Sequence, residues 1–372
     1  MSIRVLLVED SLLALVILKR ILNLSEEIEV VGEARTGLEA LKLIPEVEPD
    51  VICTDFHMPQ MDGLQLTTEV MTRYPKPILV ISVSVLENDT DHIFELLEAG
   101  AVDILPKPPT GLATDNEFFR QELINKIIIL SGVKVFKRKR RFISKSEQQW
   151  QIDSTTVHNQ IDRLIKIGNT AAFSSDFFPK PKVVVIGAST GGPQAIQELL
   201  AQLPSDFPVP VICVQHICIG FLQGFIDWLN KSCSLQIQIA QPGNVPKPKI
   251  IYFPPEKQHL ELDSRGQFIY SEKPPVDGHC PSVTTLFESV AKFYGKKTVG
   301  ILLTGMGRDG AKGMQVIAEA GGFTIAQDEA TSIVFGMPKE AIQLGAAKQV
   351  LPISAIAPML LNLVYKQTST LS

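Results

Sequence analysis

The stretch VVVIGASTGGPQAIQELL, residues 183–200, predicts a strand that turns sharply into a helix. Its apolar beginning is typical of a buried strand, and a helical pattern follows directly after the glycines. These glycines let the backbone turn tightly and approach a ligand closely, while Pro193 suits the first turn of a helix. Repeats of such a unit build a parallel α/β sheet.

The alternation of strand and helix patterns continues from this unit to the C-terminus. It predicts a doubly wound domain in which helices cover both faces of a parallel sheet. The expected strands span residues 182–188, 209–216, 249–255, 267–271, 297–305 and 322–328. The expected helices span residues 193–202, 221–231, 282–294 and 310–320.

The first 130 residues repeat this alternation and predict a second, smaller domain of the same class. The fold class is therefore α/β, with two doubly wound parallel-sheet domains at 1–130 and 181–372, joined by a linker at 131–180. The expected strands of the first domain span residues 3–9, 28–34, 50–55, 77–83 and 101–106. The expected helices span residues 11–23, 37–45, 64–74, 89–99 and 116–130.

The net charge of −5 over 372 residues hides three segments of different charge. The segments 1–130, 131–180 and 181–372 carry net charges of −12, +6 and +1. The middle one contains the run KRKRR at 137–141 and a weak helical period, so we expect a basic linker with one amphipathic helix. Adjacent cations attract phosphates, but no helix-turn-helix or zinc signature accompanies them, so nucleic-acid binding is not favoured.

The composition is that of an ordinary globular protein, with 45% hydrophobic and 20% charged residues. These proportions exclude a mostly disordered, collagenous or small disulfide-stapled chain. The five cysteines form no CxxC pair, so neither a zinc site nor a disulfide framework is expected. The N-terminus lacks a signal-peptide pattern and no apolar run could span a membrane, so we expect a cytoplasmic protein that is not itself in the membrane.

Charged and hydroxyl side chains follow several predicted strands of the first domain. Glu9 and Asp10 end the first strand, and Asp55 ends the third. Ser82 and Lys107 lie near the ends of the fourth and fifth. Ligands of open parallel sheets bind at this edge, and three carboxylates brought together suit Mg²⁺. A carboxylate beside Mg²⁺ can accept a phosphoryl group, although any one of these residues alone is better explained as a solvated loop residue.

The opening stretch also contains G-x-S-x-G at 187–191, the pattern of a nucleophile elbow, which makes Ser189 a candidate nucleophile. On this motif alone a phosphate-binding glycine turn is equally compatible, although the Walker lysine is missing. The candidate base is His216 at the end of the next strand, with His279 as the runner-up. The candidate acid is Asp309, which follows a later strand and could orient the imidazole. Two further aspartates, Asp277 and Asp328, remain alternative acids.

The order Ser…His…Asp differs from the Ser…Asp…His order of the α/β hydrolases, so that superfamily is not favoured. Backbone N–H groups after Ser189, and those beside the two glycines that flank Met306, are candidate donors to an oxyanion. His259 follows a proline-rich turn and is expected at the surface.

Three motifs of the first domain occur in order: ED at 9–10, D-x-x-M-P-x-M-D-G at 55–63 and KP at 107–108. Together they resemble a response-regulator receiver domain, which implies a flavodoxin-like fold. Glu9 stands where Asp is commoner, and Ile104 stands where Tyr or Phe is frequent. The resemblance also implies phosphorylation by a histidine kinase, with phosphoacceptor Asp55, the Mg²⁺ ligands Glu9, Asp10 and Asp55, and the switch pair Ser82 and Lys107.

The last segment carries motifs that are similar to the catalytic domain of chemotaxis protein-glutamate methylesterases, across about residues 180–365. They are IGASTGGPQAI at 186–196, QH at 215–216, DGHCPSV at 277–283, LLTGMGRDGAKG at 302–313 and GMPKEAI at 336–342. This resemblance implies a larger, Rossmann-like domain with a Ser-His-Asp triad of Ser189, His216 and Asp309. It also places Thr190 and Met306 near the oxyanion.

The resemblance implies demethylation of glutamyl methyl esters on methyl-accepting chemoreceptors, with deamidation of glutamines and no cofactor in this domain. Thr284 stands where the family often has Asp, and we expect a modest effect on substrate contacts. Two alternatives remain, which are the same chemistry on a receptor of a non-chemotaxis pathway and a non-enzymatic response regulator.

Overall fold

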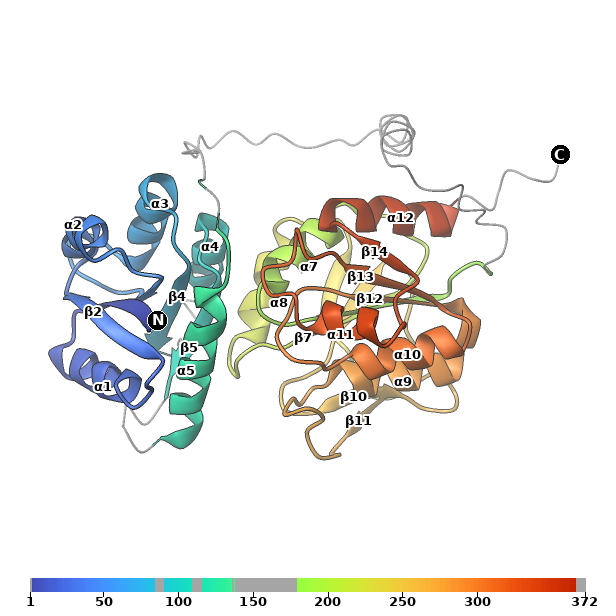
Figure 1. Ribbon diagram of the computed structural model, residues 1–372. Helices are drawn as coiled ribbons and strands as arrows, with labels where there is room; N and C mark the ends of the chain where they lie inside the picture. The colour runs from blue at the N-terminus through green and yellow to red at the C-terminus, as the bar shows by residue number, and fades with distance from the viewer. Residues whose placement is uncertain (1, 84–89, 109–115, 136, 138–178, 366–372) are drawn as a thin grey trace.

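The computed structural model describes residues 2–83, 90–108, 116–135, 137 and 179–365, which form two parallel α/β sheets (Figure 1). Within these residues, no helix is both long enough and apolar enough to cross a bilayer. The amphipathic helix expected in the linker, and all but the first residue of the basic run, lie outside the described residues.

The first sheet has the strand order β2-β1-β3-β4-β5, and all neighbouring strands are parallel. The order reverses between β1 and β3, which is where a doubly wound sheet binds its ligand. The strands are β1 (Ile3–Val8), β2 (Ile28–Ala34), β3 (Val51–Thr54), β4 (Ile78–Val83) and β5 (Asp103–Lys107). The helices are α1 (Leu12–Leu22), α2 (Gly37–Val47), α3 (Gly63–Arg73), α4 (Thr90–Ala99) and α5 (Glu117–Ser131).

The second sheet has the order β14-β13-β12-β6-β7-β9-β8, again all parallel, and reverses between β6 and β12. Its strands are β6 (Val183–Ala188), β7 (Val211–Gln215), β8 (Gln236–Ile239), β9 (Ile250–Phe253), β12 (Thr298–Leu302), β13 (Phe323–Gln327) and β14 (Gln349–Leu351). Its helices are α7 (Gly192–Leu200), α8 (Leu222–Asn230), α9 (Val283–Tyr294), α10 (Ala311–Glu319), α11 (Met337–Gln343) and α12 (Ile353–Tyr365).

Strand β6 is buried along its whole length, which explains its uninterrupted apolar sequence. Val184 and Ile186 pack in the cluster that includes α7 and α12. Val183 and Val185 point to the other face and pack in the cluster that includes α9 and α10. Because successive side chains of a strand point to opposite faces, β6 separates the core into two layers.

The structure differs from the sequence prediction in several elements. The predicted strand at 267–271 forms β11 (Phe268–Ser271), but it pairs antiparallel with β10 (His259–Leu262), which was not predicted, outside the main parallel sheet. Strands β8, β10 and β14 have only three or four residues, too few for a distinct periodic pattern. Helices α11 and α12 were also missed.

The two domains contact each other through helix α4, which lies against α7 and α8 (Figure 1). Phe94 stacks near Phe225 and Trp228, with ring centroids 5.6 and 5.4 Å apart. The indole N–H of Trp228 donates to Glu98 at 2.8 Å. An aromatic cluster with one polar anchor therefore joins the domains.

Replacing Gly187 with Ala will lower the free energy of unfolding of the second domain by about 1–3 kcal/mol. A Cβ at this position would lie 2.2 Å from Cγ1 of Val283, so helix α9 would have to move away from β6. Urea unfolding followed by circular dichroism measures the change. The control is Gly132→Ala at the end of α5, where the added Cβ meets only one carbonyl oxygen at 3.5 Å. An unchanged unfolding midpoint for Gly187→Ala would contradict this packing argument.

Candidate functional site

Three candidate residues lie at the carboxyl edge of the second sheet, around the point where its strand order reverses. Ser189 follows β6, His216 follows β7, and Asp309 lies between β12 and α10. The N–H of His216 donates to the Ala188 carbonyl at 3.0 Å, and the N–H of Ser189 donates to the Thr304 carbonyl at 3.0 Å. These bonds extend the sheet beyond its strands and hold the segments that carry the candidate residues side by side.

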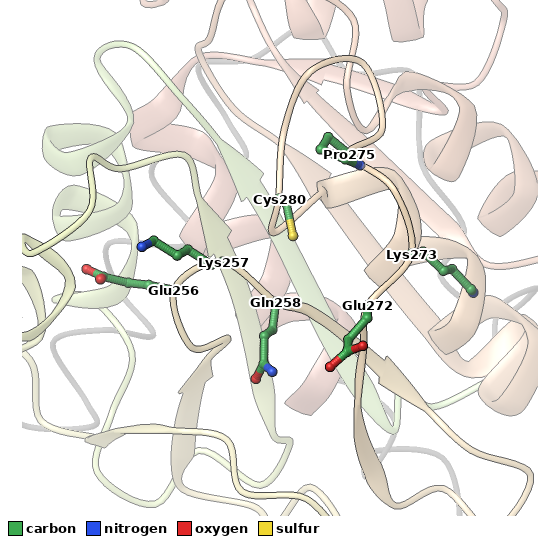
Figure 2. Close-up of a pocket in the computed structure, with 7 residues that line it drawn as sticks. All are labelled: Glu256, Lys257, Gln258, Glu272, Lys273, Pro275 and Cys280. Atoms are coloured by element: carbon green, nitrogen blue, oxygen red, sulfur yellow. The ribbon is translucent and has the colours of Figure 1, made fainter.

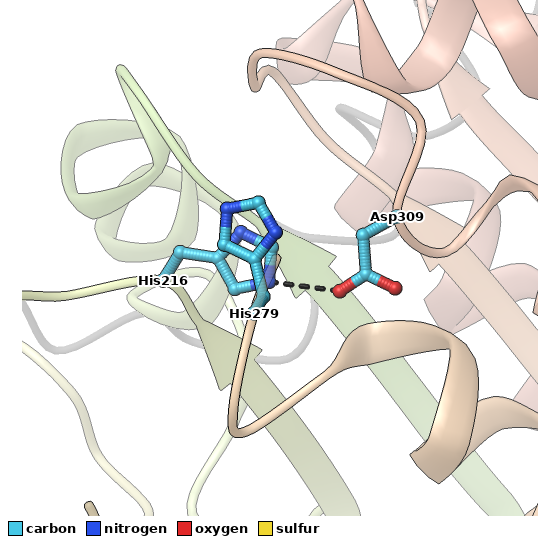
Figure 3. A group of neighbouring side chains, drawn as sticks. All are labelled: His216, His279 and Asp309. Carbon is cyan, nitrogen blue, oxygen red and sulfur yellow. Dashed lines mark hydrogen bonds and ion pairs between the residues drawn. The ribbon is translucent and has the colours of Figure 1, made fainter. Parts of the chain in front are cut away.

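His216 and Asp309 form a hydrogen-bonded pair (Figure 3). The Nε2 atom of His216 lies 2.9 Å from Oδ2 of Asp309, which is fully buried. An ionised carboxylate only accepts hydrogen bonds, so the imidazole donates through Nε2–H. In neutral His216 the lone pair is therefore on Nδ1, which is buried and has no hydrogen-bond partner in the described part of the chain.

The first residues of helix α9 hold the Asp309 carboxylate. The N–H groups of Val283 and Thr284 donate to it at 2.7 and 2.9 Å, and the Ser282 hydroxyl donates at 2.8 Å. Burial alone would raise the pKa of Asp309, but His216 and the Thr284 donor outweigh it and hold this pKa well below its usual range. Asp309 is thus an anion at neutral pH, stabilised at a helix N-terminus instead of by water.

The runner-up histidine, His279, stacks on His216 (Figure 3). The two ring centroids are 3.7 Å apart, and the ring planes differ by 8°. Burial and the nearby His216 lower the pKa of His279 to about 4, so His279 is neutral near pH 7. Asp309 is hydrogen-bonded to His216 and not to His279, which agrees with the choice of His216 as the candidate base.

A buried glutamine fixes the backbone of Ser189 and His216. The Nε2 atom of Gln215 donates to the carbonyl of Ser189 at 2.9 Å and to that of His216 at 2.7 Å. Gly192 lies against the same amide, because a Cβ there would be 2.1 Å from Oε1 of Gln215. The sequence pattern did not predict this role, and its one signal was a polar residue that ends an apolar strand.

The residues expected near an oxyanion lie around Ser189. Thr190 follows it, and a Cβ on Gly305, the neighbour of Met306, would be 2.8 Å from the Cβ of Ser189. The Thr304 hydroxyl lies 3.0 Å from the Thr190 carbonyl and ties the two loops together. Within the described residues, neither the Thr190 nor the Met306 N–H donates to another group, so both are available to a ligand.

One expectation about this domain was wrong. His259 was expected at the surface but is fully buried, and its Nδ1 accepts the N–H of Ser282 at 3.1 Å. Thr284, for which a modest effect on substrate contacts is expected, is buried, and its hydroxyl accepts the N–H of Gly310 at 2.7 Å. Both side chains support the start of α9 and the loop that carries Asp309.

The two alternative acids have other partners. Asp277 accepts a hydrogen bond from Nε of Arg308 at 2.7 Å. Asp328 accepts from the N–H and the hydroxyl of Thr331 at 2.9 and 2.6 Å. Of these three aspartates, Asp309 is therefore the one hydrogen-bonded to His216.

The second domain also carries an open hollow of about 510 Å³ (Figure 2). It begins at Cys280, the residue after His279, and its wall carries charges of both signs. An open hollow with charged side chains in its wall differs from the enclosed, mostly apolar pocket that a small ligand fills. Its lining residues are Glu256, Lys257, Gln258, Glu272, Lys273, Pro275 and Cys280.

The expected phosphoacceptor site forms at the switch point of the first sheet. Glu9, Asp10 and Asp55 each offer a carboxylate oxygen, all within 4.8 Å of one another. The ammonium of Lys107 lies 2.6 Å from Asp55 and 2.8 Å from Glu9. Ser82 is buried at the end of β4, the strand beside β5. The structure therefore brings together the residues that the sequence analysis selected here.

The charges of this cluster are strongly coupled. Burial raises the pKa of Glu9, and Asp55 adds to this effect while Lys107 opposes it. Burial alone would lower the pKa of Lys107, but Asp55 and Glu9 raise it above its usual value. The donor set consists of carboxylate oxygens, which fits Mg²⁺. Ile104, at the position where an aromatic residue is frequent, packs against the core.

Comparison with known proteins places both parts of the chain. The CheB methylesterase family model matches residues 184–360, and the response regulator receiver domain model matches residues 5–113. A protein-glutamate methylesterase/protein-glutamine glutaminase of Nitrosospira multiformis is 37% identical over 368 residues, 99% of each chain. One of Syntrophus aciditrophicus is 37% identical over 361 residues, 97% of this chain and 98% of that protein.

Among solved structures, the CheB methylesterase catalytic domain of Thermotoga maritima is 37% identical. It covers 50% of this chain and 100% of that chain, with a TM-score of 0.48.

Replacing Asp309 with Asn will destabilise the second domain by about 2–4 kcal/mol at pH 7, because buried donors lose a charged acceptor. The pKa of Asp309 is lower in the folded than in the unfolded state. Its contribution to stability is therefore present above about pH 4 and is lost as the pH falls through the folded-state value. Urea unfolding between pH 3 and 7 should show the difference from wild type shrinking toward low pH. Asp227→Asn, on the exposed face of α8, is the control, and a pH-independent difference would contradict the assignment.

Proposed function

Because the chain belongs to the CheB methylesterase family, we propose that it is a phosphorylation-regulated hydrolase acting on methyl-accepting chemoreceptors in chemotaxis. It removes methyl groups from glutamyl methyl esters and also deamidates glutamine side chains. The observation that supports this most is the buried Asp309–His216 pair beside Ser189. We divide the chain into a receiver domain at 1–130, a linker at 131–180 and a catalytic domain at 181–372.

The proposed reaction is acyl transfer through the Ser189 hydroxyl. His216 takes the hydroxyl proton at Nδ1 while the oxygen attacks the glutamyl carbonyl, and Asp309 stabilises the imidazolium at Nε2. The proton then passes to the leaving methoxide, which departs as methanol. Water attacks the acyl-enzyme along the same proton path, which releases glutamate and restores Ser189.

Ester and amide substrates pass through the same tetrahedral geometry, so one set of donors serves both reactions. The Thr190 and Met306 N–H groups are the proposed donors to the oxyanion. From a glutamine the leaving group is ammonia, and the proton path through His216 is unchanged. None of these steps requires a cofactor in the catalytic domain.

A non-enzymatic regulator explains this site less well than a hydrolase does. A buried polar atom without a hydrogen bond is costly, and the stacked pair of His216 and His279 holds two such atoms, the Nδ1 of each ring, within the described residues. The unpartnered Nδ1 of His216 is what a general base requires.

The receiver domain supplies the proposed regulation. Asp55 would accept a phosphoryl group from a histidine kinase, and Ser82 and Lys107 would contact its oxygens. A Mg²⁺ ion held by Glu9, Asp10 and Asp55 would offset the negative charge of the phosphoryl donor.

The receiver also reaches the residue next to the nucleophile. The Thr190 hydroxyl donates to Oδ2 of Asp103 at 3.1 Å, and the ammonium of Lys126 lies 2.6 Å from the same oxygen. The amide of Gln194 donates to the Ala101 carbonyl at 3.1 Å. We infer that the unphosphorylated receiver covers this edge of the catalytic domain and that phosphorylation weakens these contacts.

Replacing Ser189 with Ala will abolish methanol release from methylated receptor membranes, leaving at most the ~10³–10⁴-fold catalysis over water that binding and oxyanion donors supply. The fold will be kept, because the Ser189 hydroxyl makes no hydrogen bond within the described residues. Ser232→Ala, at an exposed position of the same domain, is the control. Wild-type turnover by Ser189→Ala would refute the mechanism.

Replacing Glu98 with Ala will raise the rate measured without phosphodonor by about two- to tenfold, because the interdomain hydrogen bond to Trp228 is lost. Asp55→Asn should keep the basal rate but lose activation by a small-molecule phosphodonor. Glu46→Ala, on an exposed position of α2, is the matched control. If Glu98→Ala has the same rate as wild type, and the phosphodonor does not raise the rate of wild type, the receiver does not regulate the enzyme by covering the site.

A further inference from the structure

Three features surround the ring of His216, and the proposed mechanism uses two of them. Asp309 binds one edge at Nε2, and the Nδ1 edge holds the lone pair that takes the proton. The third feature is His279, whose ring covers one flat face at a centroid distance of 3.7 Å. The proposed mechanism gives this second imidazole no role.

The stacked geometry excludes two roles for His279. The lone pair of an imidazole nitrogen lies in the plane of its ring, and the planes of the two histidines differ by only 8°. Stacked rings of this kind cannot aim their lone pairs at one metal ion, although both histidines and Asp309 have donor atoms within 4.8 Å of one another. For the same reason His279 cannot exchange a proton with His216 directly.

His279 is held rigidly in this position. It follows a two-residue turn of Asp277 and Gly278, both with positive φ, as the tightest hairpin turns require. Val276 and His279 close the turn with two backbone hydrogen bonds of 3.1 and 3.0 Å. Arg308, the neighbour of Asp309, binds Asp277 at 2.7 Å. The stack and the carboxylate are thus fixed by connected loops.

We propose that His279 is a positioning residue for the hydrolysis, whose ring fixes the plane of His216 and covers the face of the imidazolium during the reaction. The hydrogen bond to Asp309 fixes one atom of the His216 ring but leaves rotation about that contact. A flat neighbour removes this rotation and keeps Nδ1 directed at one place. This inference rests on the proposed roles of Ser189 and His216.

The stack also suits the charge that forms on His216. A positive charge is stabilised above the face of a neutral aromatic ring. Burial keeps His279 neutral at pH 7, as its pKa of about 4 indicates. The charged groups around the pair are Asp309, which favours a cation, and Asp277, whose charge Arg308 offsets. A neutral flat partner is therefore what a transient imidazolium needs at this face.

The test compares His279→Phe, which keeps a flat aromatic face, with His279→Leu, which fills a similar volume without one. Methanol release from methylated receptor membranes gives kcat and KM. We expect His279→Leu to lower kcat by about 10- to 100-fold, because a base displaced by about 1 Å loses this much. KM should change by less than about threefold. His279→Phe should keep kcat within about fivefold of wild type.

A second measurement does not depend on activity. The ring of His279 shifts the NMR signal of the His216 C–H protons upfield, so this shift should persist in His279→Phe and disappear in His279→Leu. Thermal unfolding checks that both variants fold. Equal kcat for the Phe and Leu variants, whether both high or both low, would overturn the inference.

Ser189→Ala separates failure of this inference from failure of the proposed function. If Ser189→Ala is inactive while His279→Leu turns over like wild type, the triad stands and the positioning role is wrong. If Ser189→Ala remains active, the proposed function is wrong, and the inference falls with it.

Discussion

A single buried negative charge, that of Asp309, organises the carboxyl edge of the second sheet. An unpaired charge in this place would cost several kcal/mol, so the fold must bring donors to it. Helix α9 supplies two backbone N–H groups and the Ser282 hydroxyl, and His216 supplies a third kind of donor. The lack of a side chain at Gly187 lets α9 approach the sheet closely enough for this arrangement. The groups at the start of α9 therefore bind the Asp309 carboxylate, and this carboxylate in turn caps the helix and binds His216.

The sequence predicted the features that depend on local hydrophobic patterns and on the way parallel strands end at one edge of a sheet. Each of the five strands of the first domain was expected within two residues of its ends, because each is a distinct apolar run between helices. Residues at the carboxyl ends of such strands must meet, which is why Ser189, His216 and Asp309 could be selected together. The family resemblance then added their proposed roles.

The features that the sequence did not predict depend on contacts between distant segments. Nothing in the local sequence says that His259 accepts from the N–H of Ser282 or that Gln215 holds two carbonyl groups. The stack of His216 and His279 arises because a tight turn and a strand end meet in space. The sequence pointed to both histidines as rivals for one role, whereas the structure shows them as partners.

Strand β5 carries one residue that binds the acidic cluster of its own domain and one residue that contacts the other domain. Lys107 at its carboxyl end binds the acidic cluster, and Asp103 at its start binds the Thr190 hydroxyl in the other domain. The two positions are about 13 Å apart along the strand and share one face, because side chains alternate with a period of two. Inserting or deleting one residue between them would turn one side chain to the opposite face. The length of this strand therefore couples the two contacts, since a one-residue change cannot keep both of them.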